Sequence, residues 1–515
     1  MKKILFAALF PMVIGMAAFT TQAPSLKDDE NGTPPDSTIT TTADDGIDVL
    51  KQVQAMNKGT KPNDRFNAGH VSFTDISNYL TKTKDGFVIK LPSNTNVPTP
   101  TVHDGKVYVS GGFGSKQYFA FDAKTGDKKW AVDIDDDGPS SGVIEDDVLV
   151  YNTESCTIFA TDAKSGKYLW SHWLGDPLMS MPAVANGKVF TAYPCYTNSG
   201  FSEEIKDKGK LVYNMHSSHV LAAFDLKTGN VLWQKWIDGD VMSAPVADGD
   251  NLYITSFPGT VYKFNQKDGE ILSAKYMRAT SAPIINDGNM TVSRRADKWD
   301  GSGKAMESIA QMDETNMTVN KQFAKKEANY LSKDVQAKSQ LKTTSMSNDA
   351  GNGFGGGAPA SSGAYVAEGN IGQSNVSSLQ SFQGSRILSY KGNNYNTMGD
   401  EIVCTDKEGK MQWTSKLSGD MHTVGGFLGT PPLAVGGKII VATYNGEIQI
   451  MDAESGKIET TYKTGENIRY QPVVEDGWIY VTSTSGKLIA INTNNSSLTG
   501  WPMWGGNAQH TNIVQ

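Results

Sequence analysis

The chain has 515 residues, 38% of them hydrophobic, and its 47 Lys and Arg against 55 Asp and Glu give a formal net charge of −8. Because no excess positive charge is available to neutralise phosphates, the composition excludes a strongly basic nucleic-acid-binding protein. Ten Trp, 19 Tyr and 19 Phe can fill a large core, which excludes a disordered chain, and 52 Gly argue against a helical bundle.

Residues 1–23 have the features of a secretory signal peptide. Lys2 and Lys3 precede an apolar stretch from Ile4 to Phe19, and small residues follow up to Ala23. A membrane anchor needs about 20 apolar residues, and no later run is long enough to span a bilayer. The cleavage zone contains no Cys that could carry a lipid. We therefore expect an exported protein, periplasmic or extracellular, with no transmembrane segment in the mature chain.

Residues 24–85 form a polar linker or N-terminal extension that is rich in Thr, Asp, Asn and Lys. This stretch lacks the repeat that follows. The sequence therefore predicts that deletion of residues 24–80 leaves folding nearly intact.

Residues 86–500 contain a repeat of four short strands separated by Gly turns, and residues 244–274 are its cleanest copy. Its third turn, Asp-x-Lys-Thr-Gly or a close variant, recurs with steps of 40 residues between many copies. Counting first strands gives eight units, which start near residues 100, 141, 182, 245, 283, 385, 431 and 472. Such repetition predicts an all-β fold, an eight-bladed β-propeller of four-stranded antiparallel blades. The fifth and sixth units are weak, so seven blades is the alternative.

The longer steps in the repeat place insertions at about 195–218 and 320–380. Within the second, Phe323–Ser339 has a helical composition, and the rest is rich in Gly, Ser and Asn. The apolar strand Phe87–Leu91 precedes the first unit, and we expect it to complete the last blade and close the ring. The tail 501–515 contains two Trp and a Met and is expected to pack on the propeller.

A Trp follows the turn Asp by seven or eight residues in four units. We expect a structural role for each, with the indole stacked over the Asp-x-x-x-Gly turn of the neighbouring blade. These residues are Trp130, Trp170, Trp233 and Trp413.

The Asp-x-Lys-Thr-Gly-x-x-x-Trp signature resembles the PQQ-like repeat family over roughly residues 87–500. That family includes quinoprotein dehydrogenases and a propeller of outer-membrane barrel assembly. Its enzymes place adjacent cysteines over the quinone, hold calcium with Glu, Asn and Asp, and use an Asp base. Here the cysteines are separated, at Cys156, Cys195 and Cys404. The resemblance therefore implies the fold without the cofactor, and we expect no bound PQQ. Whether Cys156 and Cys195 form a disulfide stays open.

One acidic segment has the pattern of a calcium loop. Asp133, Asp135 and Asp137 alternate before Gly138, as calcium loops require, but Glu145 stands one residue beyond the position of the bidentate acid. A solvated acidic turn between blades is the alternative.

The linkers that enter the innermost strands ring the mouth of the central channel, and they carry residue types that are enriched at protein interfaces. The candidate binding residues are Met181, Met242, Arg278, His422, Arg469 and Tyr470. The prediction is a monomeric, non-enzymatic scaffold that binds a protein partner in the bacterial cell envelope. The alternatives are a quinoprotein dehydrogenase, a carbohydrate- or cell-surface-binding module, and rim residues that only pack.

Overall fold

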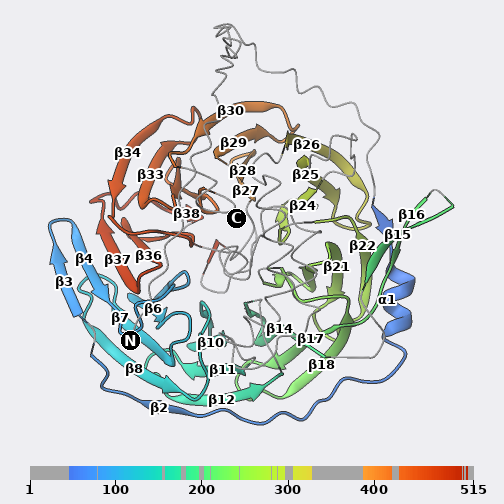
Figure 1. The fold of residues 1–515 in the computed structure, drawn as a ribbon, viewed down its shortest axis with the longest axis horizontal. Coiled ribbons are helices and arrows are strands. Elements are labelled where there is room, and N and C mark those ends of the chain that lie inside the picture. Colours follow the sequence, from blue (N-terminus) through green and yellow to red (C-terminus); the bar gives the residue numbers. More distant parts are fainter. Residues whose placement is uncertain are drawn as a thin grey trace, which may run out of the picture. The chain divides into compact units, whose positions relative to one another are not determined.

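Eight antiparallel sheets follow one another around a central axis and form an eight-bladed β-propeller (Figure 1). The described residues all belong to one unit, residues 39–515. The computed structural model describes residues 46–77, 79–153, 157–175, 181–195, 202–208, 210–242, 244–279, 281–286, 288–295, 306–327, 387–398, 400–419, 428–501, 503 and 506–507.

Each blade runs from an inner first strand to an outer fourth strand. Blade 1 consists of β5 (Thr101–His103), β6 (Lys106–Ser110), β7 (Gln117–Asp122) and β8 (Lys128–Ile134). Blade 2 consists of β9 (Val143–Glu145), β10 (Val148–Asn152), β11 (Thr157–Asp162) and β12 (Tyr168–Trp173). Blade 3 consists of β13 (Ala183–Ala185), β14 (Lys188–Pro194), β17 (His219–Asp225) and β18 (Val231–Ile237). Blade 4 consists of β19 (Val246–Asp248), β20 (Asn251–Thr255), β21 (Thr260–Asn265) and β22 (Ile271–Tyr276).

The second half of the ring repeats this order. Blade 5 consists of β23 (Ile284–Asn286), β24 (Asn289–Arg295), β25 (Met306–Asp313) and β26 (Val319–Glu327). Blade 6 consists of β27 (Ile387–Tyr390), β28 (Asn393–Met398), β29 (Glu401–Asp406) and β30 (Met411–Lys416). Blade 7 consists of β31 (Leu433–Val435), β32 (Lys438–Ala442), β33 (Glu447–Asp452) and β34 (Ile458–Lys463). Blade 8 consists of β35 (Val473–Glu475), β36 (Trp478–Thr482), β37 (Lys487–Asn492) and β4 (Gly86–Lys90).

The predicted count of eight blades is confirmed, and the two weak units are complete blades that begin at Ile284 and Ile387. Second and third strands are buried on both faces, because each blade lies between two neighbours; all five residues of β10 are buried, for example. The predicted closure is also confirmed. β4 pairs antiparallel with β37, from Gly86 opposite Ile491 to Lys90 opposite Lys487. An additional strand, β3 (Tyr79–Thr83), extends this blade outward.

The described part of the N-terminal extension lies along the outer wall of blades 4, 3, 2 and 1, and we call residues 46–77 the strap (Figure 1). It contains β1 (Ile47–Asp48), which pairs with β22, the helix α1 (Leu50–Met56), and β2 (Val71–Phe73), which pairs with β8.

The strap contributes apolar side chains to the core. Val49 and Val53 are fully buried with Trp233 and Tyr276, and Phe66 packs edge-on against Tyr193 and Phe224. These contacts argue against the prediction that deletion of residues 24–80 leaves folding nearly intact, which stays to be tested by that deletion. The polar composition of the segment did not indicate these contacts, because only a few apolar residues of the strap contact the blades.

The shorter insertion is a β-hairpin between β14 and β17, within the predicted range. It consists of β15 (Glu203–Asp207) and β16 (Lys210–Asn214). The longer insertion begins later than predicted, because β26 continues to Glu327. Phe323 therefore lies in a strand and not in the expected helix, and residues 328–386 lie outside the described set.

The C-terminal segment returns to the ring through β38 (Gly500–Trp501), which pairs with the inner strand β31 of blade 7. Met503 is buried in the core shared by blades 8 and 1, beside Phe87 and Tyr480. The expected signal peptide, residues 1–23, lies outside the described residues. Among those residues, no helix is both long enough and apolar enough to cross a membrane.

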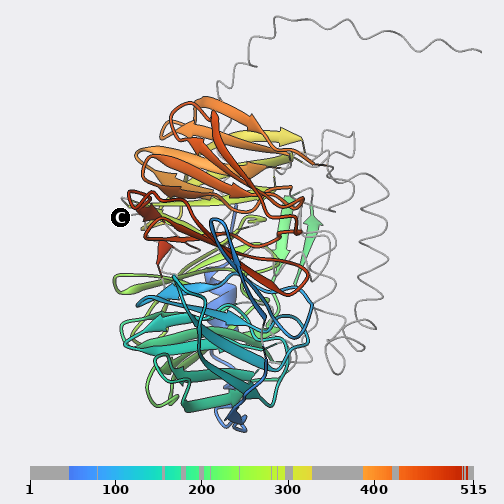
Figure 2. The ribbon, with the colours of Figure 1, turned by 90° about the vertical axis from the view of Figure 1, so that its left-hand side faces the viewer.

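The up-and-down order of the strands gives the ring two different faces. One face carries the turn between the first and second strands and the turn between the third and fourth. The other carries the linkers between blades and the turns between second and third strands, and we call it the linker face. The hairpin β15–β16 lies on the linker face, beside the edge-on blades in Figure 2.

Candidate functional site

The tryptophans of the repeat lie between neighbouring blades. Each indole N–H donates to a carbonyl oxygen in the turn of the next blade: Trp130 to Ala163 (3.0 Å), Trp170 to Leu226 (2.8 Å), Trp233 to Gln266 (2.9 Å) and Trp413 to Ala453 (3.1 Å). The turn glycine has a left-handed backbone, and a Cβ on it would come within 2.4–2.8 Å of the indole: Gly166, Gly229, Gly269 and Gly456. Glycine is therefore required by both conformation and contact.

The candidate rim residues are mostly packed inside the ring. Met181, Met242, Arg278 and Tyr470 have exposed fractions of 5%, 1%, 6% and 1%. These four side chains therefore do not form the exposed rim that the sequence suggested. His422 lies outside the described residues. Of the five candidates that the structure describes, only Arg469 is partly exposed, with its guanidinium carbon 4.6 Å from the centre of the Tyr444 ring.

Hydrogen bonds between linkers explain this packing. The Ser141 hydroxyl donates to the Thr99 carbonyl (2.7 Å), the Thr99 hydroxyl donates to the Gln471 carbonyl, and the Gln471 amide donates to the Pro432 carbonyl (3.0 Å). These bonds join blades 7, 8, 1 and 2 in sequence around the axis. The rim therefore stabilises the ring.

A different part of the linker face gathers buried polar groups around Asp238, which is 0% exposed. Its carboxylate accepts hydrogen bonds from the hydroxyls of Tyr213 (2.9 Å), Tyr262 (2.6 Å) and Thr260 (2.6 Å). Burial, and then the charge of Asp238, raise the pKa of both tyrosines well above its usual value. Both tyrosines therefore stay protonated and donate hydrogen bonds. Together with the Thr260 hydroxyl, they compensate the cost of burying the carboxylate of Asp238.

These contacts fix the base of the hairpin. Tyr213 is the penultimate residue of β16, and its ring stacks on Tyr276 of blade 4 with 3.7 Å between centroids and 3° between planes. Nearby, the Ser218 hydroxyl donates to the Asp238 carbonyl (2.8 Å) and contacts His219 Nδ1 (2.9 Å). Burial lowers the pKa of His219 to about 3, so this imidazole is neutral at physiological pH.

The strap holds the same base from the outside. The Gln52 amide of α1 donates to the Tyr213 carbonyl (3.0 Å) and accepts from the Met215 N–H (3.1 Å). A residue of a parallel strand would bond the same two groups, so one side chain replaces a strand at this edge. Asn57 does the same for blade 3, because its amide accepts from the Trp236 N–H (2.8 Å) and donates to the Trp236 carbonyl (3.1 Å).

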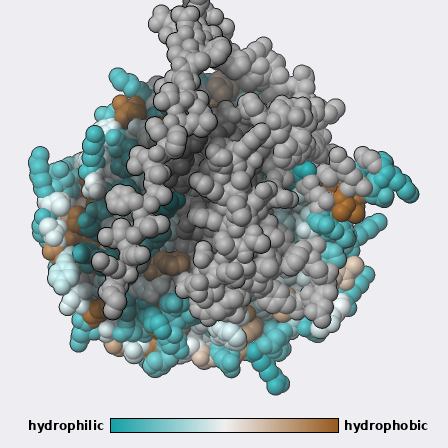
Figure 3. All heavy atoms as spheres, viewed as in Figure 1, coloured by the Kyte–Doolittle hydropathy of each residue, from teal (hydrophilic) through white to brown (hydrophobic). Residues whose placement is uncertain are grey.

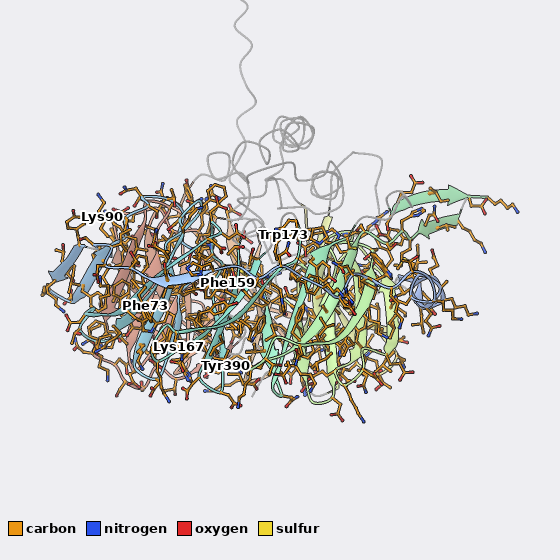
Figure 4. The ribbon with its side chains drawn as sticks, turned by 90° about the horizontal axis from the view of Figure 1, so that it is seen from below. Phe73, Lys90, Phe159, Lys167, Trp173 and Tyr390 are labelled. Carbon is orange, nitrogen blue, oxygen red and sulfur yellow. The ribbon has the colours of Figure 1, made fainter. Side chains whose placement is uncertain are left out.

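Beyond this base the hairpin projects from the ring. Figure 4 shows it extending past the blades beside α1, with side chains directed into the surroundings. At the corresponding edge of Figure 3, hydrophilic atoms surround a small hydrophobic patch. Glu203 and Asp207 are exposed, and Ile205 between them is 39% exposed. Within the described residues, β15 and β16 pair only with each other.

The acidic segment in blade 1 does not gather its carboxylates into a cluster. Asp133 accepts from the Gln117 amide (2.8 Å) at the end of β8, and Asp135 is exposed at the start of the linker that contains Asp137. Across the described part of the chain, no group of three or more His, Cys, Asp or Glu residues is placed to hold a metal ion.

A quinone site of the enzyme type does not fit the residues present. Cys195 and Cys404 are free thiols in blades 3 and 6, and the sequence has no adjacent pair of cysteines. Burial raises the pKa of both thiols, to about 12 for Cys404, so neither is an activated nucleophile. Cys156 lies outside the described residues, and because Cys195 is a free thiol, the disulfide between them that the sequence left open is not formed in this structure.

Comparison with known proteins identifies the family. A family model described as outer membrane protein assembly factor BamB matches residues 87–275 and 360–499, which is more than half of the chain. The chain belongs to this family. The described residues of both matched segments lie mostly in propeller blades, in agreement with the turn and tryptophan contacts described above.

The curated relatives are more distant and match only in part. BamB of Nitrosomonas eutropha is 22% identical over 41% of this chain and 52% of its own length. The quinoprotein alcohol dehydrogenase PedH of Pseudomonas putida is 32% identical over 18% of each protein. The chain therefore spans about half of the first relative and under a fifth of the second.

Among solved structures, BamB from Moraxella catarrhalis has a TM-score of 0.50 and 15% identity, with 80% of this chain and 100% of that chain covered. The computationally designed Ika8 protein has the same TM-score at 11% identity and covers 78% of this chain. At these identities the likeness establishes the propeller fold.

The sequence analysis did not identify the side-chain amides of Gln52 and Asn57 in the strap, or the hairpin β15–β16, as parts of one site. Two signals were available. Val49 and Val53 have the i, i+4 spacing of a short helix with one buried face, and Lys208-Gly209 lies between two segments of strand-forming residues. Neither signal indicates which blade edge the segment contacts.

Proposed function

We propose that this chain is an exported, non-enzymatic scaffold that binds a protein partner in the bacterial cell envelope. The observation that carries the proposal is the hairpin β15–β16. It is not needed to close the ring, yet its base is held by buried hydrogen bonds from blade 3, blade 4 and the strap. A rigid support below an exposed polypeptide edge is suited to recognition, because little conformational entropy is lost on binding.

Family membership supports this proposal, since the matching model is described as an outer membrane protein assembly factor. The features expected at residues 1–23 agree with export. The separated cysteines do not support quinone chemistry, although a short segment resembles a quinoprotein alcohol dehydrogenase. Shared repeats do not transfer an activity, because function depends on the site.

The test is site-specific photo-cross-linking in intact cell envelopes. A photoreactive amino acid is placed at Asp207 on the hairpin and, as a matched control, at Lys457, which is exposed in a turn of blade 7 on the opposite face. We expect one defined protein adduct from position 207 and none from position 457. The proposal is overturned if no described surface position gives an adduct, or if protein supplied with PQQ and calcium reduces an acceptor dye with an alcohol as substrate.

A further inference from the structure

The two edges of the hairpin differ in how they are used. Asp207 pairs with Lys210, so two residues separate the strands, and Lys208 has the left-handed φ of 48° that tight hairpin turns require. In such a hairpin, hydrogen-bonded and non-hydrogen-bonded pairs alternate from the turn. The pair of Glu204 and Tyr213 is then non-hydrogen-bonded, and both residues direct their backbone groups outward.

The contacts of the strap agree with this register. Gln52 bonds the outward carbonyl of Tyr213 and the outward N–H of Met215, so the outer edge of β16 is covered at its base. On β15 the outward groups belong to Glu204 and Lys206. Within the described residues, no strand other than β16 pairs with β15, so no strand covers this outer edge.

We infer that the outer edge of β15 is a docking site for an extended segment of a partner protein, which adds to the hairpin as a third strand. This inference rests on the proposed scaffold function and names its surface. The chain itself shows the mode of binding, because β1, β2 and β3 each add antiparallel to the outer edge of a blade. An unpaired edge is a ready template for such pairing.

The charges of β15 specify the kind of segment. Glu203, Ile205 and Asp207 alternate on one face of the strand, with two exposed carboxylates around an exposed apolar side chain. A matching strand has Lys or Arg opposite the acids and an aliphatic residue opposite Ile205, since cross-strand pairs of opposite charge stabilise a sheet. Two copies of β15 would bring like charges together, which disfavours pairing between copies of this chain.

The probe is a fluorescent eight-residue peptide of alternating Lys and Val, with a Glu and Val peptide as the charge control. Lys206→Pro removes an outward N–H and leaves the pairing between β15 and β16 intact, while Lys206→Ala removes the same charge and keeps the N–H. We expect at least about a tenfold weaker affinity for Lys206→Pro than for Lys206→Ala, measured by fluorescence anisotropy, because backbone bonds give such complexes their affinity.

A second measurement uses the unmodified protein. At saturating Lys and Val peptide, hydrogen exchange of the segment 202–208 is expected to slow by two amides, those of Glu204 and Lys206. Equal affinity of the Pro and Ala variants, no added protection, or equal binding of the acidic peptide overturns the docking edge. If Asp207 still gives its cross-link in that case, only this inference fails and the scaffold proposal stands.

Discussion

The boundary between blades 3 and 4 and the boundary between blades 4 and 5 are built from the same repeat but use different contacts. At the first, Trp233 packs on Gly269 and donates to Gln266. At the second, Ser273 stands eight residues after the turn Asn265, where Trp233 follows Asp225. In place of the indole contact there is a polar contact centred on Glu314, beside an apolar core that blades 4 and 5 share.

Lys263 of blade 4 donates to the backbone carbonyl of Glu314 (3.1 Å) and lies 3.7 Å from its carboxylate, which also accepts from the Tyr253 hydroxyl. Burial, together with this carboxylate, raises the pKa of Tyr253 above its usual value. An apolar contact gains free energy from buried area, whereas a polar contact mainly avoids the cost of unpaired groups. The first boundary also lies under the strap, so it has two independent supports.

Removal of the strap should have the largest effect. Deletion of residues 24–77 exposes the apolar surface that Val49 and Val53 cover, and each buried valine contributes about 1.5–3 kcal/mol. We expect a clearly lower melting temperature and binding of a hydrophobic dye. Deletion of residues 24–91 also removes β4 and should prevent folding. If the shorter deletion melts like the full chain, the strap does not support blades 3 and 4.

The tryptophan contact comes next. Trp233→Ala should lower the free energy of unfolding by about 3–5 kcal/mol, as expected for a buried aromatic side chain. Leu232→Ala is the matched control, because Leu232 is the preceding residue and is 45% exposed, so it should change stability by less than about 0.5 kcal/mol. Denaturant unfolding of both variants measures the difference. If both variants lost a similar amount of unfolding free energy, the indole contact would not be what stabilises the boundary between blades 3 and 4.

Substitutions at the Glu314 contact between blades 4 and 5 should lower the free energy of unfolding by less than Trp233→Ala does, and their effect should depend on charge. Glu314→Ala leaves the nearly buried Lys263 amine and the Tyr253 hydroxyl without the carboxylate, which costs about 1–3 kcal/mol. Glu314→Gln keeps an acceptor for Tyr253 and should lose less. Unfolding at two salt concentrations is the measurement, and the Glu314 variants should differ from the full chain in salt dependence, unlike Trp233→Ala. A larger loss for Gln than for Ala would contradict this account.

The repeat made most of the fold predictable. The spacing of the turns defined eight blades even where the sequence is weak, because each blade must bury the face of its neighbour. Phe87–Leu91 could be assigned to the last blade, since it lies the expected distance before Pro100. The tryptophans could be placed from their offset to the turn.

The rest depended on contacts that periodicity does not encode. Gln52 and Asn57 bond backbone groups more than 150 residues away, and any Gln or Asn in a polar segment has the same local signature. Tyr470 and Met242 resembled surface residues because they lie in linkers, yet both side chains are buried. The acidic residues of β15 can be read from the sequence. Its unpaired edge cannot, because that inference depends on the contacts that cover the edge of β16.

The smallest effect tests whether a side-chain amide truly replaces a strand at the base of the hairpin. Gln52→Met keeps the length of the side chain and removes both hydrogen bonds, so the Tyr213 carbonyl and the Met215 N–H lose their partner. We expect a loss of about 1–2 kcal/mol and faster hydrogen exchange of the Met215 amide, because an unsatisfied group opens more readily. Gln54→Met on the exposed side of the same helix is the control and should change neither value. Unchanged exchange at Met215 in Gln52→Met would mean that the tyrosine stack and Asp238 alone hold the base, and that the strap supports the blades but not the hairpin.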